Sequence, residues 1–287
     1  MRTKIGLAVL MLFVAGLTAC QTKLEPTKTY FTQDIRSKEG KVESLIVPGT
    51  VVLDARPNFD YQLGHLPGSI SLDPADFSKK KIPFEGELEE DLYGHARRLA
   101  RFGIAPETPV LIVGKGGQGK AEEGRLAFIL TYMGIHNVVF TSLENFSLPL
   151  VRDEAPAREN VPSWKPVLKE SMIANKKELR EYAQKVTAFP SVIDVRSESE
   201  YLREKNHVFN AINIPWIEFL DKRGEPNFAL RKKLEQLGLG ESQRVIVIGN
   251  DGNTGALAAF VLMKMGFTKV GLYAGGYRAM VGSTSAK

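Results

Sequence analysis

Short apolar runs along the chain alternate with segments whose apolar residues recur at the helical period. The runs "SVIDV" (residues 191–195) and "VIVIG" (residues 245–249) are almost entirely apolar, as is typical of strands in a parallel sheet that is covered on both faces. In "NKKELREYAQKV" (residues 175–186), Asn175 stands three positions before Glu178, which is the spacing of a capping box that begins a helix. This alternation predicts an α/β fold, with mostly parallel sheets and helices on both faces.

A pattern in the first half of the chain recurs in the second half in the same order. The stretch "VVLDARPNFDYQLGHLPGSISLD" (residues 51–73) matches "SVIDVRSESEYLREKNHVFNAINIP" (residues 191–215), and "PVLIVGKGG" (residues 109–117) matches "RVIVIGNDG" (residues 244–252). In the first pair, Asp54, Arg56, Tyr61 and His65 recur as Asp194, Arg196, Tyr201 and His207. Such a repeat predicts two homologous domains. The predicted segments are a leader (1–20), a tether (21–44), a first domain (45–150), a linker (151–167) and a second domain (168–287).

The first twenty residues have the layout of a secretory signal. Arg2 and Lys4 precede an apolar run that is too short for a comfortable membrane span, and small residues follow. The ending "LTAC" resembles the lipobox of bacterial lipoproteins, which implies that Cys20 becomes the first mature residue and carries a lipid on its sulfur. Several acyl chains on one residue make a stable membrane anchor. By the same resemblance, Gln21 at the next position implies the outer membrane. The alternative is an ordinary signal peptide with a chance cysteine.

The composition is that of a globular protein, with 43% apolar and 25% charged residues. Removal of Arg2 and Lys4 with the leader leaves 36 basic against 33 acidic residues, a net charge of about +3. This charge is too small to indicate nucleic-acid binding. Cys20 is the only cysteine, so the chain forms no internal disulfide, and a lipidated Cys20 leaves the mature protein without a thiol.

Both copies of the repeat resemble the rhodanese homology domain. The first copy, "LDARPNFDYQLGHLPGSISL" (residues 53–72), is a close match to its first signature, whereas the second copy has Phe209 and Asn210 in place of Pro-Gly. "LYAGGYRAM" (residues 272–280) resembles the Gly-Gly segment near the end of that fold. The resemblance covers residues 45–150 and 168–281, and it implies the tandem architecture of thiosulfate and mercaptopyruvate sulfurtransferases.

The resemblance implies that a cysteine begins the loop after a central strand in this family. Backbone N–H groups around the loop lower the pKa of the cysteine thiol. The thiolate takes up a sulfane sulfur as a persulfide and passes it to an acceptor. Alignment of the strands places Gly114 at this position in the first domain and Gly249 in the second. Neither glycine can carry a persulfide, so no catalytic residue is expected at these positions.

The polar residues of the repeat invite a catalytic interpretation, but the resemblance implies scaffold positions that tie strand ends to loops. These residues are Asp54, Arg56, His65, Asp194, Arg196 and His207. The remaining histidines, His95 and His136, have no Cys, Asp or Glu at ligand spacing, so neither a metal site nor a cofactor is expected.

The stretch "VLIVGKGGQGKAEEG" (residues 110–124) also has the glycine and lysine spacing of a phosphate-binding P-loop. Ala121 stands where that motif requires Ser or Thr, which favours a rhodanese loop without its nucleophile. Glycines and lysines before a helix still make a candidate site for a small anion, formed by Lys115, Gly116, Gly117, Gly119 and Lys120. The alternative is a solvated loop. In the second loop, Asp251 opposes anion binding.

Together these observations favour a lipid-anchored tandem rhodanese-like protein of the cell envelope that acts as a binding or scaffolding module without sulfur transfer. Its expected partners are the membrane, a small anion and another envelope protein. The alternative is an enzyme, either a sulfurtransferase or a hydrolase that acts on an anionic substrate at the first loop.

Overall fold

The computed structural model describes residues 46–80, 86–153, 158–184, 191–203 and 211–282 of the 287-residue chain. Residues Phe31–Lys287 belong to one compact unit. The predicted leader with Cys20 and Gln21, most of the predicted tether, and the repeat residues His207, Phe209 and Asn210 lie outside the described residues.

The first half of the chain forms a parallel four-stranded sheet in the order β2-β1-β3-β4. Its strands are β1 (Val51–Asp54), β2 (Ile70–Ser71), β3 (Val110–Gly114) and β4 (Val138–Ser142). Its helices are α2 (Asn58–Leu63), α3 (Leu92–Arg101) and α4 (Glu122–Tyr132). Every residue of β1 and β3 is buried, as the apolar runs predict for a sheet covered on both faces.

The second half repeats this arrangement as a parallel sheet in the order β6-β5-β7-β8. Its strands are β5 (Val192–Asp194), β6 (Ala211–Asn213), β7 (Arg244–Ile248) and β8 (Lys269–Leu272). Its helices are α5 (Lys176–Gln184), α6 (Glu198–Arg203), α7 (Arg231–Gln236), α8 (Asn253–Lys264) and α9 (Gly276–Gly282). The α/β fold with two similar domains, predicted from the repeat, is confirmed.

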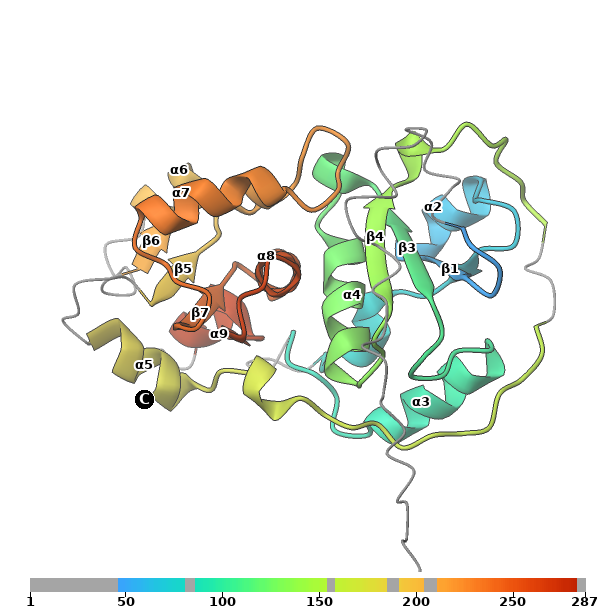
Figure 1. The fold of residues 1–287 in the computed structure, drawn as a ribbon, viewed down its shortest axis with the longest axis horizontal. Coiled ribbons are helices and arrows are strands. Elements are labelled where there is room, and N and C mark those ends of the chain that lie inside the picture. Colours follow the sequence, from blue (N-terminus) through green and yellow to red (C-terminus); the bar gives the residue numbers. More distant parts are fainter. Residues whose placement is uncertain (1–45, 81–85, 154–157, 185–190, 204–210, 283–287) are drawn as a thin grey trace, which may run out of the picture. The chain divides into compact units, whose positions relative to one another are not determined.

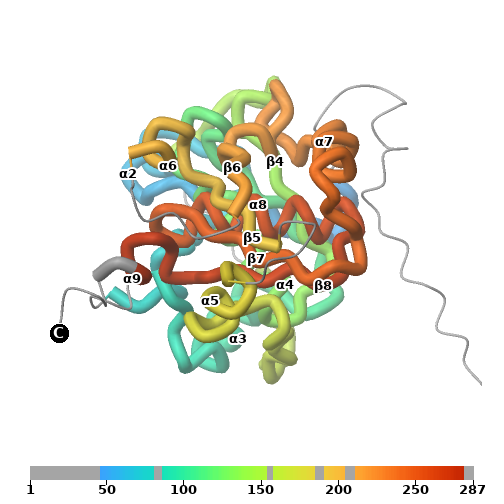
Figure 2. The backbone as a smooth tube through the Cα atoms, turned by 90° about the vertical axis from the view of Figure 1, so that its left-hand side faces the viewer, coloured from blue at the N-terminus to red at the C-terminus, as the bar shows by residue number. Residues whose placement is uncertain are grey.

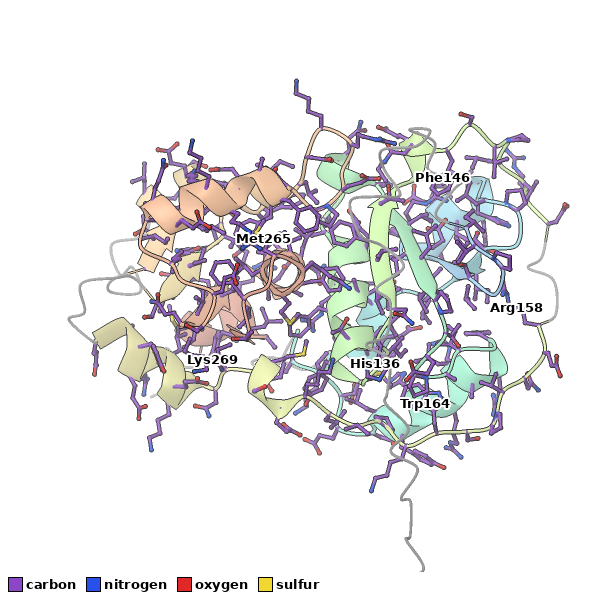
Figure 3. All side chains as sticks on the ribbon, in the orientation of Figure 1. His136, Phe146, Arg158, Trp164, Met265 and Lys269 are labelled. Carbon is purple, nitrogen blue, oxygen red and sulfur yellow. The ribbon has the colours of Figure 1, made fainter. Side chains whose placement is uncertain are left out.

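The predicted capping box at the start of α5 has its first hydrogen bond, since the backbone N–H of Glu178 donates to Oδ1 of Asn175 over 2.9 Å. The segment before it returns to the first half, where the indole N–H of Trp164 donates to the carbonyl of Ile104 over 2.9 Å. Figure 3 shows the Trp164 side chain on this segment. In the described part of the chain, no helix has the length and hydropathy needed to cross a membrane.

Helices α4 and α8 pack against each other and join the two halves (Figure 1 and Figure 2). Most of their residues are buried, because each helix also covers a sheet. The rings of Phe140 on β4 and Phe260 on α8 lie 5.7 Å apart between centroids. One apolar cluster therefore runs through both halves. It places the amino ends of α4 and α8, with the loops before them, at the junction between the halves.

Candidate functional site

Two loops follow the central strands of the sheets, and each leads into the helix at the junction. The first loop (residues 115–121) joins β3 to α4, and the second loop (residues 249–252) joins β7 to α8. Each ends on a residue in the left-handed backbone region, Ala121 with φ of 64° and Gly252 with φ of 89°. Such a conformation is unusual for alanine and indicates a tightly constrained turn. Ligands of open parallel sheets bind at this carboxyl end of the strands.

The first loop has the backbone geometry of an anion-binding nest. Lys115 has φ and ψ of −92° and 2°, and Gly116 follows with φ of 55°. Alternation of these two conformations turns successive N–H groups toward one point. The carboxyl group next to this loop is the chain's own, on Glu123 in the first turn of α4.

Glu123 fills the space in which a side chain at position 114 would lie. A Cβ atom placed on Gly114 would overlap Oε2 of Glu123 and would lie 2.5 Å from its Cδ and 2.8 Å from its Cβ. Real Cβ atoms do not approach other atoms this closely. The position where the resemblance expects a nucleophile in the first domain is therefore a glycine with a carboxyl group packed against it.

The Glu123 side chain is fully buried, and neither of its oxygens has a hydrogen-bond partner of good geometry among the described residues. The pKa of Glu123 is raised to about 8, mainly by burial and to a smaller extent by the charge of Glu122. The N–H groups of Glu123 itself and of Gly116 act in the opposite direction, which places the carboxyl group next to the nest. At neutral pH the site favours the protonated carboxyl group.

The two lysines of the predicted anion site point away from this interior. Nζ of Lys115 lies 3.0 Å from Oδ2 of Asp60, so its charge is paired. Lys120 is exposed, and its backbone N–H donates to Oε2 of Glu122 over 2.7 Å. The structure keeps the five predicted residues together on one short loop, with Gly117 and Lys120 on its exposed side. An external anion has to bind on that side or displace Glu123.

The second loop is closed at the corresponding position. A Cβ atom on Gly249 would lie 2.5 Å from Oγ1 of Thr254 and 2.6 Å from the backbone nitrogen of Gly255. The backbone around it is also used, because the N–H of Tyr277 donates to the carbonyl of Gly249 over 2.7 Å. A side chain at Gly249 would require a shift of the first turn of α8.

Arg125, which the sequence analysis did not single out, links the first half to the second loop. Its guanidinium donates to the carbonyl of Gly252 over 3.3 Å and to the carbonyl of Gly86 over 2.5 Å. Burial lowers its pKa to about 10, and the negative charge of Asp251 opposes that shift. The available signal was an arginine within the apolar stretch "GRLAFIL" (residues 124–130). In the first turn of α4, the side chain of Glu123 therefore contacts the first loop and that of Arg125 contacts the second loop.

The repeated Asp-x-Arg pairs form equivalent buried contacts. Arg56 donates to both oxygens of Asp54, with Nη2 2.7 Å from Oδ2, and Arg196 binds Asp194 in the same way over 2.7 Å. Nη2 of Arg56 also donates to the carbonyl of Gly64 over 2.7 Å. In the first half, the contact with Gly64 ties the end of β1 to the turn after α2.

The histidines among the described residues are also engaged in local contacts. His65 stacks on Tyr61 with 3.8 Å between ring centroids, and His95 stacks on Phe77. Nε2 of His136 lies 3.4 Å from Oε1 of Glu107. Within the described residues, no group of three or more His, Cys, Asp or Glu side chains is placed to hold a metal ion.

Comparison with solved structures finds the same fold in other proteins. SseA of Escherichia coli, described as a 3-mercaptopyruvate sulfotransferase, shares 20% identity, with a TM-score of 0.64 over 82% of this chain and 95% of its own. EanB, solved with ergothioneine linked to a cysteine persulfide, shares 19% identity, with a TM-score of 0.69 over 83% of this chain and 63% of its own. At this level of identity the likeness establishes the fold alone. A comparison with curated proteins finds no match.

The family model described as the rhodanese-like domain matches residues 39–143 and 175–283, which correspond to the two halves of the repeat. These two regions contain both parallel sheets, both loops and the helices at the junction. The chain belongs to the rhodanese-like domain family.

Proposed function

We propose that this protein is a lipid-anchored rhodanese-like module of the cell envelope that binds a ligand or partner and does not transfer sulfur. The observation that carries the proposal is the closure of both loop positions. Atoms of Glu123 occupy the side-chain space at Gly114, and atoms of Thr254 and Gly255 occupy it at Gly249. Persulfide chemistry needs a thiolate at the loop entrance, so this chain lacks both the reacting atom and the room for it.

The test is a sulfur-transfer assay on the full chain carrying Cys20→Ser, which contains no thiol. We expect no transfer from thiosulfate or 3-mercaptopyruvate to cyanide above the rate of a heat-denatured sample. The same sample should form no persulfide when thiosulfate is added. Turnover that persists when Gly114→Val and Gly249→Val are introduced separately would mean that the active site lies elsewhere and that the protein is an enzyme.

A variant with a thiol in the second loop tests whether the loop is closed as well as lacking a nucleophile. Gly249→Cys brings a Cβ to within 2.6 Å of the Gly255 nitrogen, so we expect a less stable fold and little recovered transfer. Efficient transfer by this variant, with unchanged stability, would contradict the closed-loop argument.

The anchoring part of the proposal depends on the resemblance of "LTAC" to a lipobox. In cells, labelled fatty acid should enter the wild-type chain and not the Cys20→Ser variant. The wild type should also sediment with outer membranes. Equal labelling of both forms would exclude lipidation at Cys20.

A further inference from the structure

A groove of about 580 Å³ lies where segments of the two halves meet. This volume is within the range of small-molecule sites in proteins. Its lining contains no residue of the first or second loop, but it borders the second loop, because a Cβ atom on Gly252 would overlap the carbonyl oxygen of Ala274 in the lining. Its lining includes Glu87–Glu90 and Leu92 of the first half, Tyr132 at the end of α4, Leu168 and Ile173–Lys176, and Tyr273–Gly275 and Ala279 of the second half.

The walls of the groove are held by backbone hydrogen bonds, so the site is formed before any ligand arrives. In the first half, the N–H of Lys79 donates to the carbonyl of Glu87 over 2.7 Å, and the N–H of Glu89 donates to the carbonyl of Phe77 over 2.8 Å. In the second half, the N–H of Ala174 donates to the carbonyl of Leu272 over 2.9 Å. A preformed wall lowers the ordering cost of binding.

The lining combines an apolar surface with carboxylates. Leucine, isoleucine and tyrosine side chains supply the apolar part, and Tyr132 and Tyr273 are both buried. Burial raises the pKa of Tyr273, the charge of Glu87 adds to this increase, and the charge of Arg180 opposes it. A cation between a carboxylate and an aromatic face gains from both.

The charges of the lining favour a cationic ligand. Glu87, Glu89 and Glu90 contribute three carboxylates, whereas Lys176 contributes one ammonium group, which donates to the carbonyl of Met280 over 3.4 Å. Lys79 lies outside the lining and bridges Glu87 and Glu90 at 3.7 Å and 3.1 Å. Glu89 is exposed at the groove.

We propose that this groove binds a free small molecule with a cationic amine and an apolar body. The apolar part packs on the leucine and tyrosine side chains, and the amine meets the carboxylates of Glu87 and Glu89. The proposed contacts use no residue of either loop, so the proposal stands whether or not the chain transfers sulfur.

The experiment uses the purified full chain and 2-phenylethylammonium as the probe, with calorimetry and saturation-transfer NMR. The matched probes are 2-phenylethanol, which lacks the charge, and 3-phenylpropionate, which reverses it. We expect saturable binding of the amine and binding of both matched probes at least fivefold weaker. Equal affinity for the amine and the alcohol, or no saturable binding of the amine, would overturn the proposal.

Three variants locate the binding. Glu87→Gln combined with Glu89→Gln should weaken binding of the amine at least fivefold, and Ala279→Trp should abolish it by filling the groove. Glu235→Gln, a charge change on an exposed residue outside the groove, should leave the affinity within twofold. Circular dichroism verifies that each variant is folded. Unchanged binding by a folded Ala279→Trp variant would place the probe elsewhere and overturn the assignment.

Discussion

Glu123 carries a carboxyl group into the first loop, where the nest of N–H groups would otherwise receive an anion from outside. The Glu123 side chain fills the space next to Gly114, and burial in this position favours the neutral form of its carboxyl group. At the scale of single residues, the character of the loop depends on this group as much as on the glycine at position 114. Its titration makes the arrangement measurable.

We predict that Glu123→Gln removes a pH dependence of stability. The folded chain holds a proton on Glu123 up to a pKa of about 8, whereas the unfolded chain releases it near the ordinary value of 4.5. The free energy of unfolding of the wild type should therefore fall as the pH rises from about 4.5 to about 8. At about 1.4 kcal/mol per pKa unit, the loss is a few kcal/mol. Urea denaturation at pH 5, 6.5 and 8.5 measures it.

The variant should match the wild type near pH 5 and exceed its stability at pH 8.5, with Glu235→Gln as a control that follows the wild type at every pH. Parallel curves for wild type and Glu123→Gln would contradict the buried titration.

The same samples test the predicted anion site on the first loop. Sulfate should bind weakly to the first loop, more weakly after Lys115→Ala with Lys120→Ala and at high salt. If neither the wild type nor Glu123→Gln binds sulfate, the predicted anion site is wrong.

Residue patterns predicted some of this site and missed the rest for a physical reason. The glycines at positions 114 and 249 were located because they end apolar runs, which sequence patterns reveal well. Glu123 and Arg125 were not identified, since acidic residues commonly begin helices and an arginine on a helix is usually exposed. Their roles depend on what lies opposite α4, and the chain's own periodicity does not contain that information.

At the scale of elements, the crossing of α4 and α8 depends on a glycine. A Cβ atom on Gly124 would lie 2.5 Å from Cγ and 2.7 Å from Cα of Leu257 on α8. Glycine costs an isolated helix about 1 kcal/mol relative to alanine, so its presence in the first turn of α4 reflects close approach of the two helices.

We predict that Gly124→Ala lowers the free energy of unfolding by about 2 kcal/mol, because overpacking exceeds the gain in helix propensity. Gly240→Ala is the matched control, since a Cβ atom there meets nothing within 4 Å and its φ is not positive. That control should be neutral or slightly stabilising. Chemical denaturation compares the three proteins. A Gly124→Ala variant as stable as the control would show that α4 and α8 do not approach this closely in solution.

At the scale of the whole molecule, the repeat predicted two similar domains, and both sheets have the same strand order. The shared interior was not predicted, although α4 and α8 are apolar on nearly all sides. A helix apolar all round indicates burial on both faces but does not identify what covers the second face. Here each helix covers its own sheet and the other helix, and Arg125 adds a hydrogen bond from the first half to the second loop.

This shared interior predicts that the two halves unfold together. Trp164 packs on the first half through Ile104, and Trp216 belongs to the second half. The chain has these two tryptophans, so Trp216→Phe leaves Trp164 as a fluorescent probe of the first half. In the same way, Trp164→Phe leaves Trp216 as a probe of the second half. In urea, we expect the fluorescence midpoint of each variant to coincide with its midpoint by far-ultraviolet circular dichroism. Arg125→Met should lower both midpoints, because it removes a buried hydrogen bond to Gly252 that spans the halves and another to Gly86 within the first half. Separate midpoints in either single-tryptophan protein would mean that the halves are independent and that the α4–α8 contact contributes little to stability.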